Sequence, residues 1–446
     1  MQYILYSLAL VVLSLYFFPF EFTFLPGMNT KMMMAGIGLV VLAIQFAKKR
    51  KVAADNDFML ITILAVIVSL IGFISVTYNG THDYTYATYI VSMLVWLSAA
   101  NLVLALIRTI HGRVNVTLIC DYLIVLCVVQ CSLALIIDGI PSVKEFVDSF
   151  LSGQGFMGKN EHRLYGIGCS LDVAGTRFCA ILLMCIYQIV QISSKQELDE
   201  KRKFWHMLWY LSAFMFISIV GNMIARTTTI GVALAFLYLL ILTRPFSIIS
   251  IEKHKLIWRM TGIMLFVAIC FTVLFYNISP VFKYNLRFAF EGFFSLAEKG
   301  TWEVNSNEIL KNMVVFPDEI KTWVIGNGYF DNPYDREPYY TGVRWHGFYQ
   351  NTDIGYLRFI FYFGIFGLIT FMVYITKVAL TCRKRLPETG VLFLMLLLLN
   401  FTIWCKVSTD IFLVFALFLC LPYKTEPEKL TIKENITSDS QTVDMQ

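Results

Sequence analysis

Arginine residues stand where long apolar stretches of this sequence begin or end. Arg163 follows His162 just before one such stretch, Arg226 lies in a short break between two, and Arg358 lies about one helical turn into another. A guanidinium group keeps its charge and binds phosphate oxygens through two parallel hydrogen bonds. Together with Arg287, which lies in an amphipathic segment, these arginines predict a site for a diphosphate group.

A structural role is the alternative for these arginines, because an arginine in a membrane protein can reach the surface and pair with an acid there. Asp172 is placed to pair with Arg177, which would make Arg177 structural. Asp353 precedes Arg358 by five residues, and this offset is not an ideal same-face pair on a helix. We therefore expect that Asp353 does not simply neutralise Arg358.

The sequence indicates no other kind of catalytic centre. Of the six histidines, His162 and His346 lie nearest in the predicted topology to these arginines, and the long polar segment that contains His346 has no DxD motif. No P-loop or nucleophile elbow is present. The ten cysteines lie nearly all in apolar runs without a CxxC pair, and we interpret them as small buried side chains. We predict no metal site and no cofactor.

Apolar residues dominate the elements that must position these arginines. The chain has 446 residues, of which 57% are hydrophobic and 15% are charged, whereas a soluble domain carries roughly 25% charged residues. Apolar runs of about 20 residues recur along it, and in lipid such runs must be helices to satisfy their backbone polar groups. The predicted fold class is all-α, a polytopic transmembrane helical protein with about 12 spans and one large extracytoplasmic loop carrying interfacial helices. The predicted spans are 3–20, 30–47, 58–77, 85–107, 115–137, 171–192, 206–224, 228–243, 257–277, 353–376, 389–404 and 409–422.

The distribution of lysine and arginine predicts the orientation in the membrane. With both termini in the cytoplasm, 21 of the 36 Lys and Arg residues lie on the cytoplasmic side. The clusters at 48–51 and 383–385 are typical of cytoplasmic segments. The net charge of +5 comes from such clusters between spans, so it does not indicate a nucleic-acid partner.

Four regions follow from this topology. Residues 1–277 hold the first nine spans, with an outer loop at 138–170, and residues 278–352 form the large extracytoplasmic loop. Residues 353–422 hold the last three spans. Residues 423–446 are polar and predict a disordered cytoplasmic tail.

The large loop is rich in aromatic residues, with 17 Phe, Trp and Tyr. Residues 281–298 have an apolar face at helical spacing and predict a helix at the membrane interface. A second short helix is predicted at 305–316, ending before Pro317, and the segment 326–328 (GNG) predicts a turn. The aromatic side chains are either an interfacial belt with a small core or surfaces on which sugar rings stack.

Four segments resemble the Wzy-type O-antigen and polysaccharide polymerases, in the superfamily that also contains the O-antigen ligases. RLYG at 163–166 is similar to the family's outer-loop arginine with its following glycine. ARTT at 225–228 resembles a Ser-Arg-Thr pattern, with alanine in place of the serine. WVIGNGYF at 323–330 resembles a loop segment ending in Gly-x-Gly. The segment 346–368 is similar to the closing segment, in which a histidine, an asparagine and Asp-x-Gly-Tyr lead into a span.

The resemblance implies a metal-independent glycosyltransferase of the bacterial inner membrane that uses polyprenyl-diphosphate-linked oligosaccharides as donor and acceptor. The arginines would stabilise the charge that develops on the diphosphate leaving group. His346 is the candidate general base for the acceptor hydroxyl, and Asp353 is the second candidate. Asn351 and Tyr356, in the same segment, are assigned to substrate positioning. Besides the lipid bilayer, a chain-length regulator and a flippase are the implied partners.

Three other functions stay open at this level. An O-antigen ligase, which moves a finished glycan onto another acceptor, shares most of these motifs; the DIGYLR segment at 353–358 looks more like the polymerase form. A 12-span polysaccharide or lipid transporter would often show repeats and short central loops, and we see no repeat. A non-enzymatic scaffold would not need arginines on the outer side.

Overall fold

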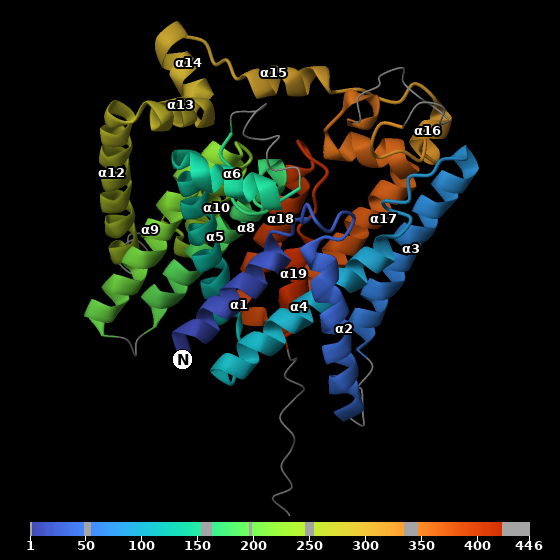
Figure 1. Ribbon diagram of the computed structural model, residues 1–446, viewed down its shortest axis with the longest axis horizontal. Coiled ribbons are helices and arrows are strands. Elements are labelled where there is room, and N and C mark those ends of the chain that lie inside the picture. The colour runs from blue at the N-terminus through green and yellow to red at the C-terminus, as the bar shows by residue number, and fades with distance from the viewer. Residues whose placement is uncertain are drawn as a thin grey trace, which may run out of the picture.

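Long helices that run between two ends of the molecule make up most of the computed structural model (Figure 1). The structure describes residues 2–48, 55–152, 163–195, 199–245, 254–333 and 347–421. The apolar helices are α1 (Gln2–Phe17), α2 (Thr30–Lys48), α3 (Asn56–Asn79), α4 (Tyr89–His111), α5 (Val116–Gly139), α8 (Leu171–Ser194), α9 (Glu200–Ile224), α10 (Thr228–Thr243), α12 (Lys255–Ile278), α17 (Gly355–Arg385), α18 (Gly390–Ile403) and α19 (Phe412–Leu419). The shorter connecting helices are α6 (Pro141–Phe150), α13 (Pro280–Ala289), α14 (Glu291–Lys299), α15 (Asn305–Asn312) and α16 (Ile320–Val324).

The helices confirm the predicted all-α class of a polytopic membrane protein. Eight of those in the described ranges are long and apolar enough to cross a membrane, and three shorter apolar helices accompany them at Tyr3–Phe17, Thr228–Thr243 and Pro387–Ile403. The described residues form isolated β-bridges but no strand. The described residues do not include the candidate base His346 or the predicted tail at 423–446.

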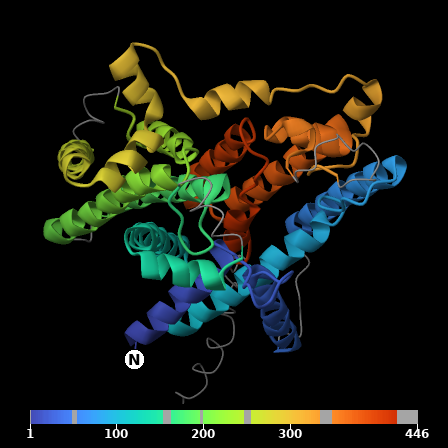
Figure 2. The same ribbon diagram turned by 45° about the horizontal axis from the view of Figure 1, so that its top comes forward.

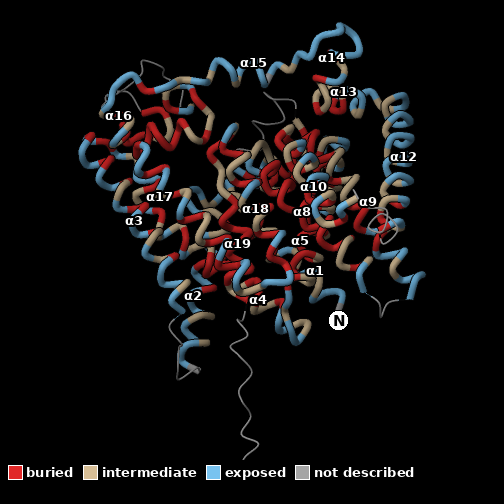
Figure 3. The backbone as a smooth tube through the Cα atoms, turned by 180° about the vertical axis from the view of Figure 1, so that it is seen from behind, coloured by how far each residue is buried: buried red, intermediate tan, exposed pale blue. Residues whose placement is uncertain are grey.

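Burial differs strongly from helix to helix (Figure 3). Helix α8 is buried along most of its length, as are α19 and much of α17. By contrast, Ile257 and Met260 are the only buried residues among the described residues of α12. Helix α12 packs mainly against α9 and α13, so it stands at the rim of the bundle (Figure 1).

Ion pairs join α3 and α17 at one end of the bundle. Lys377 and Lys384 each lie 2.7 Å from a carboxylate oxygen of Asp57, and Arg385 pairs with Asp55. Asp55 also caps α3, because its carboxylate accepts hydrogen bonds from the first backbone N–H groups of that helix. This end carries the Lys and Arg cluster at 383–385 that predicts the cytoplasmic side.

Toward the opposite end, α17 is broken at Phe363 and Gly364, where the backbone leaves helical geometry. The predicted turn at 326–328 fills the break, because the N–H groups of Asn327 and Gly328 donate to the carbonyl oxygens of Phe361 and Tyr362 at 2.6 and 3.1 Å. A side chain at Gly326 would meet the Tyr362 carbonyl oxygen at 2.4 Å, so only glycine allows this approach. The turn therefore anchors the large loop to the bundle.

The predicted helix at 281–298 is two helices in the structure. Phe290 lies outside helical geometry between α13 and α14. After this break, Gly292 in α14 packs against the indole of Trp302, where a side chain would meet ring atoms at 2.5 Å. Helices α13, α14 and α15 cross the end of the bundle that lies opposite the Lys and Arg cluster (Figures 1 and 2). Helix α15 ends at Asn312, earlier than the predicted 316.

Candidate active site

Two guanidinium groups lie close to one aromatic ring of α13. Arg163 and Arg226 lie over the Phe288 ring, 5.2 and 4.0 Å from its centroid. Arg226 also donates from Nε to the Phe288 carbonyl oxygen at 2.9 Å, and its NH1 lies 2.7 Å from a carboxylate oxygen of Glu291. Residues 163 and 226 come from separate loops, so the tertiary structure brings these two predicted site residues together. We call Arg163 and Arg226 the arginine pair.

The electrostatics of the arginine pair reflect this proximity. Burial lowers the pKa of Arg226, the charge of Glu291 opposes this, and the charge of Arg163 lowers the pKa further. Two like charges that repel each other gain stability from a shared anion. The pair is therefore suited to a ligand with more than one negative charge, provided that Glu291 gives up its place beside Arg226.

A second group of charged side chains gathers around Thr227, the residue that follows Arg226. Lys406, in the loop after α18, lies 2.9 Å from both the Asp172 carboxylate and the Thr227 hydroxyl, and the Thr227 hydroxyl donates to Asp172. Asp172 was expected to pair with Arg177, but Arg177 is buried over the Phe18 ring instead. The reason is that Asp172 stands at the first turn of α8, where it points toward the α9–α10 turn and the Lys406 loop.

Arg358 is held by groups of the protein. Its guanidinium lies 2.8 Å from the Asp331 carboxylate, donates to the Ser408 hydroxyl at 2.8 Å, and lies 3.6 Å from the Asp353 carboxylate. The expectation that Asp353 leaves Arg358 without simple neutralisation is wrong, because Asp353 precedes the helix and its position does not follow helical spacing. The Arg358 side chain is 6% exposed.

The Asp353 carboxyl is influenced by the charges of Arg358, Asp172 and Lys406. Burial raises the pKa of its carboxyl to about 7, Arg358 opposes the rise, and the charge of Asp172 adds to it. Lys406 also opposes the rise. The Asp353 carboxyl therefore exists in both protonation states near neutral pH, which is the property required of a general base.

The other predicted site residues occupy different surroundings. Arg287 forms a two-bond pair with Glu298 at 2.7 Å for each bond, and this pairing raises the pKa of Arg287. Arg287 and Arg226 line one pocket of about 380 Å³. Tyr356 donates its hydroxyl to the carbonyl oxygen of Phe401 at 2.9 Å, so it joins α17 to α18. Asn351 is exposed and has a left-handed backbone with φ 55°.

Sequence reasoning missed Lys406 and Asp331, although one signal was available for Lys406. A lysine between two short apolar runs on the predicted outer side opposes the usual charge bias, just as Arg226 does. Asp331 had no such signal, since it stands in a polar loop. Within the described ranges, no three His, Cys, Asp or Glu side chains are grouped as a metal would need.

Comparisons of the chain with protein-family models, with curated proteins and with solved structures found no match. What the site can do therefore has to follow from the chemistry of its own residues and from the resemblance of its motifs. In chemical terms, the site combines cations for an anionic group with a carboxyl group that can exchange a proton near pH 7.

Proposed function

We propose that this protein is an integral-membrane glycosyltransferase that polymerises polyprenyl-diphosphate-linked oligosaccharide repeat units into a surface polysaccharide. In this proposal it belongs to the Wzy-type polymerases, crosses the bacterial inner membrane about 12 times with both termini in the cytoplasm, and exposes residues 278–352 on the outside. The distribution of Lys and Arg and the resemblance of four segments support this assignment.

The observation that carries the proposal is the gathering of charged side chains at one end of an apolar bundle. Asp172, Arg226, Asp353, Arg358 and Lys406 come from segments far apart in sequence, yet they form a linked group of ion pairs and charge contacts. Charged residues are costly near a membrane interior and are usually kept there for function. The group lies away from the Lys and Arg cluster at 383–385.

The proposed reaction is a single displacement. The hydroxyl oxygen of the acceptor sugar forms a bond to the anomeric carbon of the donor, and the bond from that carbon to the diphosphate oxygen breaks. The polyprenyl diphosphate leaves with the electron pair, and the arginine pair stabilises its charge. Asp353 takes the proton of the acceptor hydroxyl, with His346 as the other candidate for this step.

Arg358 takes a different part in this proposal from the one that its position in the sequence suggested. Its contacts to Asp331, Asp353 and Ser408 use its donors within the protein. We assign it to positioning Asp353 and the loop around Asp331, while the arginine pair binds the diphosphate. Arg287, paired with Glu298 on the surface, is assigned to the rim of the diphosphate site.

The surface glycan of a strain that lacks the gene tests the proposal. A polymerase deletion leaves single repeat units on their acceptor, whereas a ligase deletion leaves full-length chains on the polyprenyl carrier. A glycan of unchanged length and attachment, measured by gel electrophoresis and mass spectrometry, would rule out both enzymes. Restoration of long chains by wild-type protein, but not by the Asp353→Asn variant, would link the activity to this site.

A further inference from the structure

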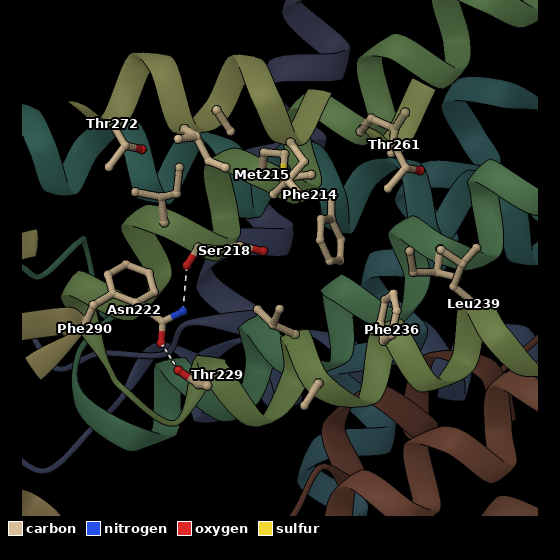
Figure 4. Close-up of a pocket in the computed structure, with 18 of the residues that line it drawn as sticks. Phe214, Met215, Ser218, Asn222, Thr229, Phe236, Leu239, Thr261, Thr272 and Phe290 are labelled. Atoms are coloured by element: carbon tan, nitrogen blue, oxygen red, sulfur yellow. Dashed lines mark hydrogen bonds between the residues drawn. The ribbon is translucent and has the colours of Figure 1, made fainter. Parts of the chain in front are cut away.

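A large apolar cavity lies beside the arginine pair. It has a volume of about 680 Å³, within the range of about 300–1,000 Å³ that ligand pockets occupy. Helices α9, α10 and α12 form most of its walls, Ile186 and Ile189 of α8 line it as well, and α13 and α14 close one end (Figure 4). None of the described residues that line it carries a charge; five of them are phenylalanines, at positions 214, 236, 290, 293 and 294.

The position of α12 explains why this space exists. Helix α12 packs mainly against α13 and α9, and its buried residues, Ile257 and Met260, lie near its start, so few of its side chains reach the bundle. Ala268 on α12 and Ala233 on α10 line the cavity with small side chains, where larger ones would close it. In a membrane, an apolar space of this size next to a rim helix is open to apolar chains rather than to water.

The cavity adjoins the pocket that contains Arg226, and the two share a lining residue. Asn222 and Thr229 line it and are hydrogen-bonded to each other at 2.6 Å, and they flank Arg226 in the chain. At the same end, Phe290 lines the cavity next to Glu291, the ion-pair partner of Arg226. Phe294 lines both this cavity and the pocket that contains Arg226 and Arg287. A single ligand can therefore place an apolar chain in the cavity and an anionic group at the arginine pair.

We propose that the cavity between α9, α10 and α12 binds the isoprenoid chain of the donor lipid, whose diphosphate lies at the arginine pair. This assignment rests on the proposed function for the identity of the lipid. Charge complementarity favours a diphosphate over the headgroup of an ordinary phospholipid, because two guanidinium groups lie close to one ring while a phosphodiester carries a single charge. The chain then enters from the bilayer past α12.

A photo-crosslinking experiment on the full-length protein in lipid nanodiscs tests the site without measuring polymerisation. One probe is a polyprenyl diphosphate with a diazirine in its isoprenoid chain, and the other is phosphatidylglycerol with a diazirine in an acyl chain. We expect the polyprenyl probe to label peptides of α9, α10 and α12. Labelling should fall in the Arg226→Ala variant, because the diphosphate loses part of its anchor.

Two tryptophan variants of α12 form a matched pair. Ala268→Trp fills the cavity, whereas Val267→Trp adds the same ring at an exposed neighbouring position that does not line it. Losing the burial of about two methylene groups already weakens binding about tenfold, so Ala268→Trp should lower labelling at least that much. Val267→Trp should label as the wild type does. Thermal unfolding of both variants shows whether each is folded, and Ala233→Trp repeats the test from α10.

Three results would overturn the assignment. Equal labelling of Ala268→Trp and Val267→Trp would place the chain elsewhere. Labelling by the phospholipid probe that matches the polyprenyl probe and ignores Arg226→Ala would mean that any acyl chain fills the space. Crosslinks confined to helices that do not line the cavity would exclude it directly. If the cavity binds the polyprenyl probe but deletion of the gene leaves the surface glycan unchanged, the lipid site stands and the polymerase proposal fails.

Discussion

Replacing Asp353 by asparagine tests whether its carboxylate has a catalytic or a structural role. Asparagine keeps the shape of the side chain but cannot accept the proton of the acceptor hydroxyl. General-base catalysis contributes about 10²–10⁴-fold, so polymerisation by purified Asp353→Asn should fall by that factor, while binding of the lipid-linked donor stays near the wild-type value. The diphosphate contacts the arginine pair and does not contact Asp353 in the proposed reaction.

The rate of polymerisation should depend on pH through the protonation of Asp353. A base must be deprotonated, and burial raises the pKa of Asp353 to about 7. The rate of the wild-type enzyme should therefore rise with pH below about 7 and level off above it. Lys406 lowers this pKa and Asp172 raises it, so Lys406→Met should move the rise to higher pH and Asp172→Asn to lower pH.

Stability should respond in the opposite direction from activity. The ordinary pKa of this carboxyl is 3.8 and its folded value is about 7, so the folded state favours the protonated form. The contribution to stability is complete below about pH 4 and is lost as the pH rises to about 7. This difference between the two pKa values corresponds to at most roughly 4 kcal/mol. Asp353→Asn removes this cost, so at pH 8 it should unfold at the same temperature as the wild type or above it.

Asp331→Asn serves as the control, because Asp331 is the closer acid partner of Arg358. It should keep the rise of rate with pH, since the base is unchanged. Chain length on gels gives the rate, and thermal unfolding in detergent gives the stability. Asp353 is not the base if Asp353→Asn retains both full rate and the same pH profile, and the base would then be sought at His346. If Asp353→Asn unfolds well below the wild type at pH 8, Asp353 is a structural partner of Arg358.

Three further predictions concern the arginine pair and the topology. Arg226→Lys keeps the charge but loses the planar fork of the guanidinium, so it should impair polymerisation nearly as much as Arg226→Ala. The control Arg259→Lys, on the predicted cytoplasmic side, should be active, and full activity of Arg226→Lys would reject a two-bond phosphate contact. Glu291→Gln removes the carboxylate that competes for Arg226 and should tighten binding of polyprenyl diphosphate about two- to fivefold, as measured by titration in nanodiscs; weaker binding would mean that Glu291 orients the arginine for its ligand. A cysteine at Ser306 should react with an impermeant thiol reagent in intact cells and one at Ser194 only after lysis, and the reverse pattern would invert the topology.

The sequence alone determined the long apolar helices of this protein, because helices in lipid follow from the local run of apolar residues. Each long run forms a helix, and the turn at 326–328 stands where the GNG segment predicted it. A turn depends on the backbone freedom of nearby glycines, and this is a local property. The sequence also marked residues 163, 226 and 353 as candidates, since charged groups beside apolar runs are visible without a structure.

The tertiary structure decided which charges meet, because ion pairs here join segments that are distant in sequence. Asp172 binds Lys406 across more than half of the chain, and no helical spacing relates the two. Arg358 finds Asp331 in the large loop only because the 326–328 turn fills the break in α17 and fixes that loop. The break at Phe290 likewise sets Glu291 against Arg226.

The cavity is likewise a feature that only the tertiary structure decided. Ala233, Ala268 and the phenylalanines that line it have the ordinary composition of apolar helices, and nothing in their spacing predicts a space between them. Its volume arises from the distance between α12 and the α9–α10 pair, and α13 packs against both α12 and α9. The local sequence therefore specified apolar helices and isolated charges, and long-range packing alone placed an apolar cavity next to two arginines.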